Sequence, residues 1–369
     1  MKIRIDRKIL AQAIAEVAPY APSKPVVAVL KNAKFTTRGN RMKIEANDTQ
    51  CSVAKYVETL ECDQDGSFLM DMADFNKFIS KIKGDEVEIE VEDNSVHVKH
   101  KNGTADFQTE DAKDFPEIKI PKDNVIEIQI GANILADAIS KAKSFVANDK
   151  LRPIMTAIYA YVKDNEFGFC ASDTHKLIHG YSAIDNAGDM DIHWIIIPTS
   201  FTAIVNACKS ADVAKIQITE KHVSYFIGAT RIMTLQIQGN FPNFARVIPK
   251  EWNMECSVDK GDFSDALSRI SLFCDSTECI KMNVSNLDMA ISVDNLDKMK
   301  KSTEHLMHNG CNGNIQIGVN VSHIQTCASI FNAGDVLLRM TDATRPILFT
   351  QQDNENVKAI VMPMALINQ

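Results

Sequence analysis

The stretch KIRIDRKILAQAIAEVA, residues 2–18, decides the fold, because two altered copies of it follow in the chain. The copies are EIQIGANILADAISKAK at residues 127–143 and ECSVDKGDFSDALSRIS at residues 255–271. Each begins with alternating apolar residues, the pattern of a strand, and continues with apolar residues at i, i+3, i+4 and i+7, the pattern of an amphipathic helix. In the first copy the helical positions are Leu10, Ala13, Ile14 and Val17. This recurrence predicts three similar structural units.

A second strand–helix pattern recurs about 65 residues into each unit. It covers residues 67–91, 193–218 and 314–340, and a Gly-Asp or Ala-Asp pair follows each expected helix. Glycine fits the position just after a helix, where the backbone turns left-handed. Together with Phe-Pro stretches near residues 115 and 241, the repeats predict three domains at residues 1–121, 122–250 and 251–369. We expect an α+β fold in which each domain has two strand-helix-strands units, with sheets on one side and helices on the other.

Composition is typical of a folded protein, with 45% hydrophobic and 24% charged residues among 369. No apolar run approaches the ~20 residues that a membrane helix needs, and the first residues contain no signal-peptide core. We therefore expect a soluble, cytoplasmic protein. The nine cysteines form no CxxC pair, so they predict neither a disulfide framework nor a zinc ribbon.

Charge is distributed unevenly along the chain. Six helices are expected, at residues 7–18, 73–83, 132–145, 199–209, 261–273 and 320–333, and together they carry a net charge of +4. Because the whole chain carries −8, the residues outside these helices carry −12. One interpretation is that the lysines lie on solvated helix faces. The other is a basic helix layer, which would attract phosphates without reading bases. The charge pattern permits a DNA partner and leaves both interpretations open.

Two clusters of residues allow an enzymatic or metal-binding interpretation. Asp173, His175 and His179 could form a metal or acid–base set, but on a strand residues 175 and 179 lie about 13 Å apart. Residues 304–311, EHLMHNGC, have tolerable zinc-ligand spacing, although a polar loop before a strand is the simpler interpretation. Phosphate loops and GxSxG elbows are absent, and no nucleophile is paired with a base. The sequence therefore predicts a non-enzyme without cofactor or metal.

Five short blocks occur together along the chain: RPIM at 152–155, ASDTHKL at 171–177, GNFPNFARVIPK at 239–250, IGVNVSHI at 317–324 and VMPMAL at 361–366. In this combination and order the chain resembles the bacterial DNA polymerase III beta subunit, the replication sliding clamp family. The resemblance implies a head-to-tail homodimer that forms a ring around duplex DNA, with helices inside and sheets outside. It implies a non-catalytic accessory subunit of the DNA polymerase III holoenzyme, which tethers the replicative polymerase and gives it processivity. Any polymerase or nuclease activity would belong to the complex.

The resemblance also implies a hydrophobic groove between the second and third domains. Such a groove binds short peptides of the polymerase alpha subunit, the clamp loader, other polymerases and repair proteins. Methionine suits this task because its flexible thioether repacks around different side chains. From the residues alone, plain core is the preferred interpretation of Met362 and Met364, and the resemblance reverses this. The second-domain positions carried over are Met155, Ser172, Thr174, His175, Lys176, Leu177, Pro242, Arg246 and Val247. The third-domain positions are Asn320, His323, Thr344, Pro346, Val361, Met362, Pro363, Met364 and Leu366.

Positions matching the family's DNA contacts are Lys24 and Arg152, and the helix charges add Lys77, Lys81, Lys141 and Lys143. Positions matching the dimer contact are Phe107, Leu272 and Phe273.

The chain departs from the family pattern at several positions. Thr174 stands where glycine is usual, and Ala365 where a basic or polar residue is frequent. Asp149 stands where the family can offer a neutral DNA contact, and Thr199 and Ser200 stand where basic residues are common, so direct DNA contact is expected to be weaker or redistributed.

Two rival functions remain open at this point. A metal-dependent hydrolase would use Asp173, His175 and His179. A monomeric peptide-binding scaffold would keep the groove without encircling DNA.

Overall fold

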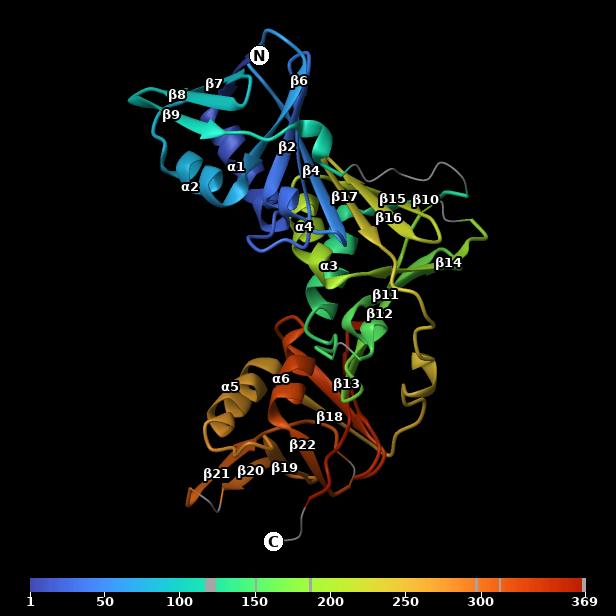
Figure 1. Ribbon diagram of the computed structural model, residues 1–369. Helices are drawn as coiled ribbons and strands as arrows, with labels where there is room; N and C mark the ends of the chain where they lie inside the picture. Colours follow the sequence, from blue (N-terminus) through green and yellow to red (C-terminus); the bar gives the residue numbers. More distant parts are fainter. Residues whose placement is uncertain (117–123, 150, 186–187, 296–297, 312, 367–369) are drawn as a thin grey trace. The chain divides into compact units, whose positions relative to one another are not determined.

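The computed structural model describes residues 1–116, 124–149, 151–185, 188–295, 298–311 and 313–366 (Figure 1). The chain divides into two compact units. Unit 1 contains Met1–Asp137 and Thr199–Ile237, and unit 2 contains Ala138–Pro198 and Gln238–Gln369. The boundary expected between residues 121 and 122 lies outside the described residues.

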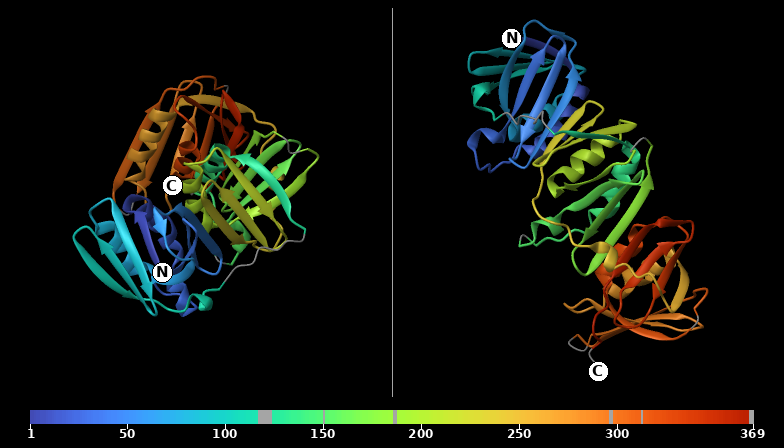
Figure 2. Two further views of the ribbon diagram at one scale, coloured as in Figure 1. Left: turned by 90° about the horizontal axis from the view of Figure 1, so that it is seen from above. Right: turned by 90° about the vertical axis from the view of Figure 1, so that its right-hand side faces the viewer.

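Unit 1 contains two antiparallel sheets (Figure 2). The larger one runs in the order β10 (Ile126–Gly131), β15 (Val213–Ile218), β16 (His222–Ile227), β17 (Thr230–Leu235), β4 (Cys51–Glu58), β3 (Arg41–Asn47), β2 (Asn32–Arg38) and β6 (Gly66–Asp71). The smaller one runs β5 (Glu61–Cys62), β1 (Lys2–Asp6), β7 (Glu86–Glu92), β8 (Ser95–His100) and β9 (Gly103–Gln108).

Unit 2 repeats this plan. Its eight-stranded sheet runs β14 (Asp191–Ile196), β11 (Ile158–Lys163), β12 (Glu166–Ser172), β13 (Lys176–Ala183), β25 (Asn354–Val361), β24 (Ile347–Gln351), β23 (Asp335–Met340) and β18 (Met254–Asp259). Its four-stranded sheet runs β21 (Lys300–Leu306), β20 (Met289–Asn295), β19 (Cys279–Val284) and β22 (Ile315–Asn320).

Six α-helices occur in the described parts of the chain, at the six predicted places. They are α1 (Arg7–Val17), α2 (Met72–Lys81), α3 (Ala132–Ala142), α4 (Pro198–Cys208), α5 (Lys260–Ser271) and α6 (Val321–Ser329). Within the units, α1 packs beside α2, and α5 packs beside α6 (Figure 1). No helix in the described ranges has the length and apolar character to cross a membrane.

The helix ends differ from the prediction, and this changes the charge count. Lys83, Lys143 and Lys209 lie just beyond the helices to which they were assigned. As bounded here, α1 and α2 carry +1 each and the other four helices are neutral, which gives +2 instead of +4. The three lysines follow C-terminal helix ends, where the helix dipole favours a positive charge.

Four of the helices, α1, α2, α5 and α6, combine an apolar face with a capped first turn. In α1 the side chains of Leu10, Ala13, Ile14 and Val17 are buried, as the spacing predicts. Asp6 accepts hydrogen bonds from two N–H groups of the first turn of α1. The corresponding residues before α2, α5 and α6 each accept one N–H in the same way, which satisfies donors that helix geometry leaves free. They are Asp71, Asp259 and Asn320.

The central segment is shared between the two units through strand pairing. In unit 1, β4 of the first repeat pairs antiparallel with β17 of the second. In unit 2, β13 of the second repeat pairs antiparallel with β25 of the third. Each eight-stranded sheet therefore joins two successive repeats, and the strands of the central repeat contribute to both.

Replacing Asp259 with Ala should lower stability by about 1 kcal/mol, because the first turn of α5 loses the acceptor of the Asp262 N–H. Circular dichroism should show the thermal midpoint of unit 2 falling by about 2–4 °C. The matched control is Asp265→Ala, which removes an exposed carboxylate from the middle of α5 and should change little. Equal midpoints for the two variants would contradict the capping role.

Candidate functional site

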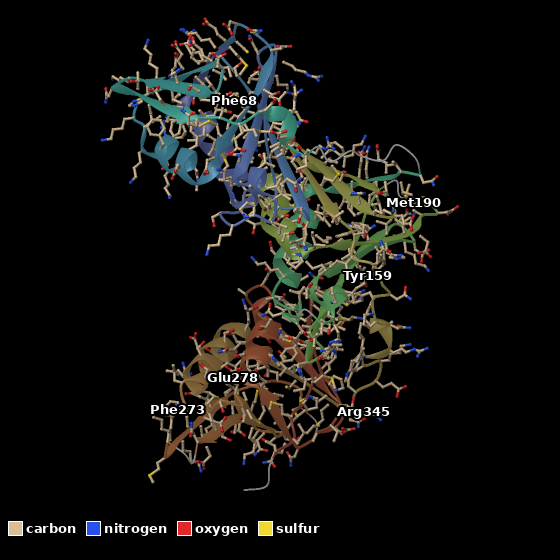
Figure 3. The ribbon with its side chains drawn as sticks, in the orientation of Figure 1. Phe68, Tyr159, Met190, Phe273, Glu278 and Arg345 are labelled. Carbon is tan, nitrogen blue, oxygen red and sulfur yellow. The ribbon has the colours of Figure 1, made fainter. Side chains whose placement is uncertain are left out.

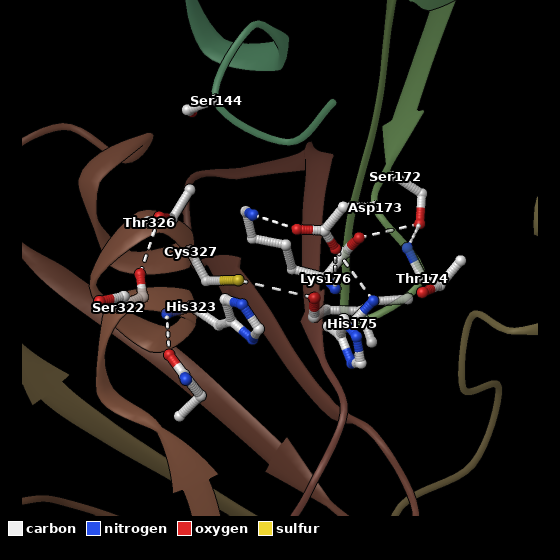
Figure 4. Close-up of polar contacts among 12 residues, drawn as sticks. Ser144, Ser172, Asp173, Thr174, His175, Lys176, Ser322, His323, Thr326 and Cys327 are labelled. Carbon is white, nitrogen blue, oxygen red and sulfur yellow. Dashed lines mark hydrogen bonds and ion pairs between the residues drawn. The ribbon is translucent and has the colours of Figure 1, made fainter. Parts of the chain in front are cut away.

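The turn between β12 and β13 is fixed by its own polar side chains (Figure 4). The Asp173 carboxylate accepts the backbone N–H groups of His175 at 2.9 Å and Lys176 at 2.8 Å, and it pairs with the Lys176 ammonium. Burial raises the pKa of Asp173, but these bonds outweigh burial and leave that pKa below its ordinary value. The Ser172 hydroxyl donates to the Lys176 carbonyl at 2.9 Å and accepts from the Thr174 N–H at 3.1 Å. The turn is therefore a rigid platform.

The C-terminal strand is joined to this platform. Lys176 pairs with Val361 in the β13–β25 ladder, and the Met362 N–H donates to the His175 carbonyl at 2.8 Å. Pro363 then ends the ladder, because proline has no N–H to donate. The chain is held again where the Met364 N–H donates to the Gly318 carbonyl at 2.7 Å.

Gly318 allows this second attachment. A Cβ at residue 318 would lie 2.6 Å from the Met364 carbonyl oxygen and 2.9 Å from Leu366 Cδ2, closer than atoms can approach. The backbone of the segment after β25 is thus fixed on both sides. The side chains of Met362 and Met364 are half-buried, so they are neither closed core nor free in solvent.

Two imidazole rings face each other beside the platform. His175 and His323 stack with ring centroids 5.5 Å apart and planes 20° from parallel. His323 lies in the first turn of α6, where its N–H donates to the Asn320 side chain at 3.0 Å. Burial, aided by the nearby Lys176 ammonium, lowers the pKa of His323. The lowered pKa favours the uncharged form of the stacked His323 ring.

An aromatic cluster lies beneath the other end of β13. Tyr159 stacks on Phe241 with centroids 5.1 Å apart, and His179 packs against Phe244 at 5.0 Å. Both rings of the 241–244 segment lie on a buried group that includes Leu177 and Ile360. Burial and the cross-strand Lys358 lower the pKa of His179 to about 4, so its ring is neutral near pH 7.

A cavity of about 570 Å³ opens beside this cluster. One wall contains Arg246 and Val247, at the end of η5 (Phe244–Arg246), and the other contains Thr341, Arg345 and Pro346 (Figure 3 labels Arg345). Its size lies within the range of about 300–1,000 Å³ that is usual for ligand pockets. Val247 is 43% exposed, so an apolar surface faces the opening.

The structure brings most of the predicted groove residues together in unit 2. Thr174, His175 and Lys176 belong to the platform, His323 stacks on His175, and Asn320 caps the helix that carries His323. Arg246, Val247 and Pro346 line the cavity. Met155, Ser172, Leu177 and Val361 are buried, while Pro242 and Thr344 are exposed. Met362, Pro363, Met364 and Leu366 are half-buried along the C-terminal segment. Their use as a peptide groove remains a prediction.

Sequence reasoning missed three aromatic residues and two cavity residues. Phe241 and Phe244 stand in the quoted block GNFPNFARVIPK, which was interpreted as a linker apart from Pro242, Arg246 and Val247. The two phenylalanines, three residues apart, were the available signal. Nothing in the local pattern marked Tyr159, Thr341 or Arg345, because their proximity depends on strand pairing.

The predicted metal alternatives do not assemble. His179 contacts the Tyr161 hydroxyl at 3.0 Å, while Asp173 is occupied by Lys176. In the second cluster, Glu304 binds Arg269, His305 binds Asp288, His308 contacts the Ser285 carbonyl, and Cys311 contacts the Gly313 carbonyl. Across the described residues, no three His, Cys, Asp or Glu side chains come within reach of one metal ion.

The predicted DNA-facing cations are mostly exposed. Lys77 lies 3.9 Å from Asp74, and Arg152 lies 3.6 Å from Asp149, so each is partly neutralised. Ser200 is fully buried and cannot contact DNA, whereas Thr199 is exposed. Lys24, Lys77, Lys81, Lys143 and Arg152 are exposed, and Lys141 is half-buried.

The predicted dimer residues lie on one edge strand and just after a helix that packs against another edge strand. Phe107, on the edge strand β9, packs edge-on against Phe75 at 5.5 Å and Phe78 at 5.3 Å. Leu272 follows α5 and is 75% exposed, while Phe273 beside it is half-buried (Figure 3). α5 packs against β20 and the edge strand β21.

Comparison with known proteins gives one consistent result. Residues 1–119, 129–243 and 245–365 match the N-terminal, central and C-terminal domains of the DNA polymerase III beta subunit. The beta sliding clamps of Bacillus subtilis and Pseudomonas aeruginosa are each 21% identical, over 99% of this chain and 99% and 100% of theirs.

Solved structures show the same fold. The DNA polymerase sliding clamp of Bacillus subtilis superposes with a TM-score of 0.93 at 20% identity over the whole of both chains. A DnaN sliding clamp of Pseudomonas aeruginosa bound to griselimycin gives 0.95 at 20% identity, over 99% of this chain and all of the other.

Replacing Thr174 with Gly should stabilise unit 2. Thr174 has φ +82°, a backbone conformation that a β-branched residue adopts at a cost of about 1–3 kcal/mol. The gain should be about 0.5–1 kcal/mol, because glycine loses more backbone entropy on folding. Thermal unfolding checks the direction, and Thr49→Gly, at φ +78° in unit 1, is the matched variant. A lower midpoint for Thr174→Gly would show that the turn is not strained.

Proposed function

Because the chain belongs to the DNA polymerase III beta subunit family, we propose that two copies close head to tail into a ring around duplex DNA. The ring is a sliding clamp: it tethers the replicative DNA polymerase and makes synthesis processive. The chain is an accessory subunit of the DNA polymerase III holoenzyme and catalyses no reaction itself.

The equivalence of edge strands carries this proposal. Each repeat contains two three-stranded meanders. The first meander ends in β4, β13 and β21 in repeats one, two and three, and the second ends in β9, β17 and β25. The pairs β4–β17 and β13–β25 are formed within the chain. The remaining pair, β21 and β9, consists of two strands that each stand at a sheet edge. Pairing β21 of one copy with β9 of the other forms the same kind of strand pair a third time and covers these two edges.

Charge at the two edges favours antiparallel pairing. Lys298, Lys300 and Lys301 stand at the beginning of β21 and are exposed. Glu110 and Asp111 follow the end of β9. In an antiparallel pair the beginning of one strand meets the end of the other, so the lysines of one copy would meet the carboxylates of its partner.

DNA binding in the ring would be topological, so individual contacts can be weak. A net +2 on the helices, with lysines at several helix ends, gives mild attraction to phosphates and no means of reading bases. Asp149 beside Arg152 weakens the local contact further. Such a surface suits sliding, which strong base contacts would prevent.

The groove of unit 2 would bind short linear peptides of the polymerase alpha subunit, the clamp loader, other polymerases and repair proteins. Its hydrophobic half is the cavity beside Val247 and Pro346, and its flatter half is the surface between the His175–His323 pair and Met362 and Met364.

We place the three clamp domains at residues 1–121, 122–250 and 251–369. Because the proposed role is in DNA replication, we expect the protein to act in the cytoplasm.

Replacing Phe273 with Asp should dissociate the ring, because it places a charge at an edge that the partner strand must cover. Light scattering on a size-exclusion peak should give 41.0 kDa instead of twice that mass. Leu287→Asp is the matched control, since Leu287 is an 81% exposed apolar residue of the same repeat and its replacement should leave the dimer intact. A dimeric Phe273→Asp protein would remove this residue from the contact.

Replacing Met364 with Asp should abolish binding of a labelled peptide that copies a polymerase tail, because an anion replaces the apolar wall of the groove. Fluorescence anisotropy should show at least a hundredfold loss of affinity while the mass stays that of the dimer. Met190→Asp, another half-buried methionine of unit 2, should bind the peptide normally. If the Met364→Asp protein binds the peptide with unchanged affinity, Met364 is a core residue and does not form part of the groove.

A further inference from the structure

A basic cavity lies on the open face of the larger sheet in unit 1. Its volume is about 600 Å³, and four cationic side chains line it: Lys34, Arg38, Arg41 and Lys43. They come from β2 and β3, at alternate positions of each strand. Such a concentration of positive charge is unexpected in a chain with a net charge of −8.

Strand register places these side chains on the sheet face opposite the helices. Phe35 pairs with Ile44 and Phe68 on the face that α1 covers, so the neighbouring residues of β2 and β3 point the other way. The cavity is therefore separate from the helix surface that would face DNA in a ring. It is also separate from the peptide groove, which lies in unit 2.

Two of the cations face each other across β2 and β3, although Glu58 is the partner of Arg41 in the β3–β4 ladder. Arg38 and Arg41 are directly opposite in the β2–β3 ladder, an arrangement that is destabilising for like charges. Among the residues that the structure describes, neither guanidinium forms an ion pair. Lys43 does bind Glu45 at 2.7 Å, so the excess charge is concentrated at the two arginines.

The remaining lining residues supply hydroxyls and orientation. The Ser67 hydroxyl donates to the Thr36 hydroxyl at 3.1 Å, across the β2–β6 ladder. The Arg41 guanidinium lies over the Tyr56 ring at 5.0 Å from its centroid, which limits the positions open to this side chain. The cavity thus combines oriented cationic donors with neutral hydroxyl groups.

We propose that this cavity binds a polyphosphate chain, either free or as part of a nucleoside polyphosphate. Guanidinium groups match phosphate oxygens in pairs of parallel hydrogen bonds, and several phosphates in a row would satisfy several cations at once. The volume fits a ligand of nucleotide size. A bound polyphosphate would also remove the repulsion between Arg38 and Arg41.

Isothermal titration calorimetry on the full-length protein, at low salt and without magnesium, tests the proposal with inorganic triphosphate as the probe. We expect one saturable site per chain. The double variant R38A/R41A should bind triphosphate at least tenfold more weakly. The double variant R38Q/R41Q, which removes the charges but keeps longer side chains, should show a similar loss. The matched control is R231A, because Arg231 also lies over an aromatic ring in the same sheet, Phe226, but is not among the residues that line this cavity. It should bind within twofold of the unaltered protein.

Three results would overturn the site: no saturable binding, equal binding by R38A/R41A, or an equal loss in R231A. ATP titrated in parallel identifies the source of the phosphates. If ATP binds more tightly than triphosphate, the ligand is a nucleotide. If the two bind equally, the cavity recognises only the phosphate groups. A single-stranded oligonucleotide that displaces triphosphate at far lower concentration would contradict a small ligand.

Discussion

The backbone of an edge strand must find a partner, and this requirement organises the whole chain. The β4–β17 and β13–β25 ladders each join the final strands of meanders from successive repeats, over five paired residues apiece. Each backbone hydrogen bond contributes only about 0.5–1.5 kcal/mol net. Removing a ladder, however, would expose two rows of polar groups and the apolar residues beside them. Repeats that join in this way leave one strand of each of these two kinds unpaired, β9 and β21, each at a sheet edge.

The same joint creates the surface proposed to bind peptides. Because β25 pairs with β13, the residues that follow β25 pass beside the 173–175 turn and reach Gly318 on β22. The backbone of two half-buried methionines is thereby held between the 172–176 turn and β22. This half of the proposed groove is a consequence of the joint between the second and third repeats, while the cavity half is lined by residues of the 243–251 segment and by Thr341, Arg345 and Pro346.

Local sequence patterns predicted the structural features that depend on residues close together in the chain. The i, i+3, i+4, i+7 spacing and the second recurring strand–helix pattern located the six helices of the described residues, and the altered copies of residues 2–18 indicated three repeats. Helix ends were less accurate, because Lys83, Lys143 and Lys209 continue a polar pattern beyond the last helical turn. Pairing between distant strands left no local signal, so neither the shared sheets nor the position of Tyr159 could be predicted. The groove positions came from the family resemblance. The basic cavity escaped notice because charge was counted on helices, although residues 34–43, KFTTRGNRMK, already alternate cations on two adjacent strands.

Small-angle X-ray scattering on a size-exclusion peak tests most directly whether the open edges of two copies meet. A particle of twice 41.0 kDa, with the distance distribution of a hollow ring, is the expected result. A compact or elongated particle of 41.0 kDa that persists at micromolar concentration would contradict closure through β9 and β21.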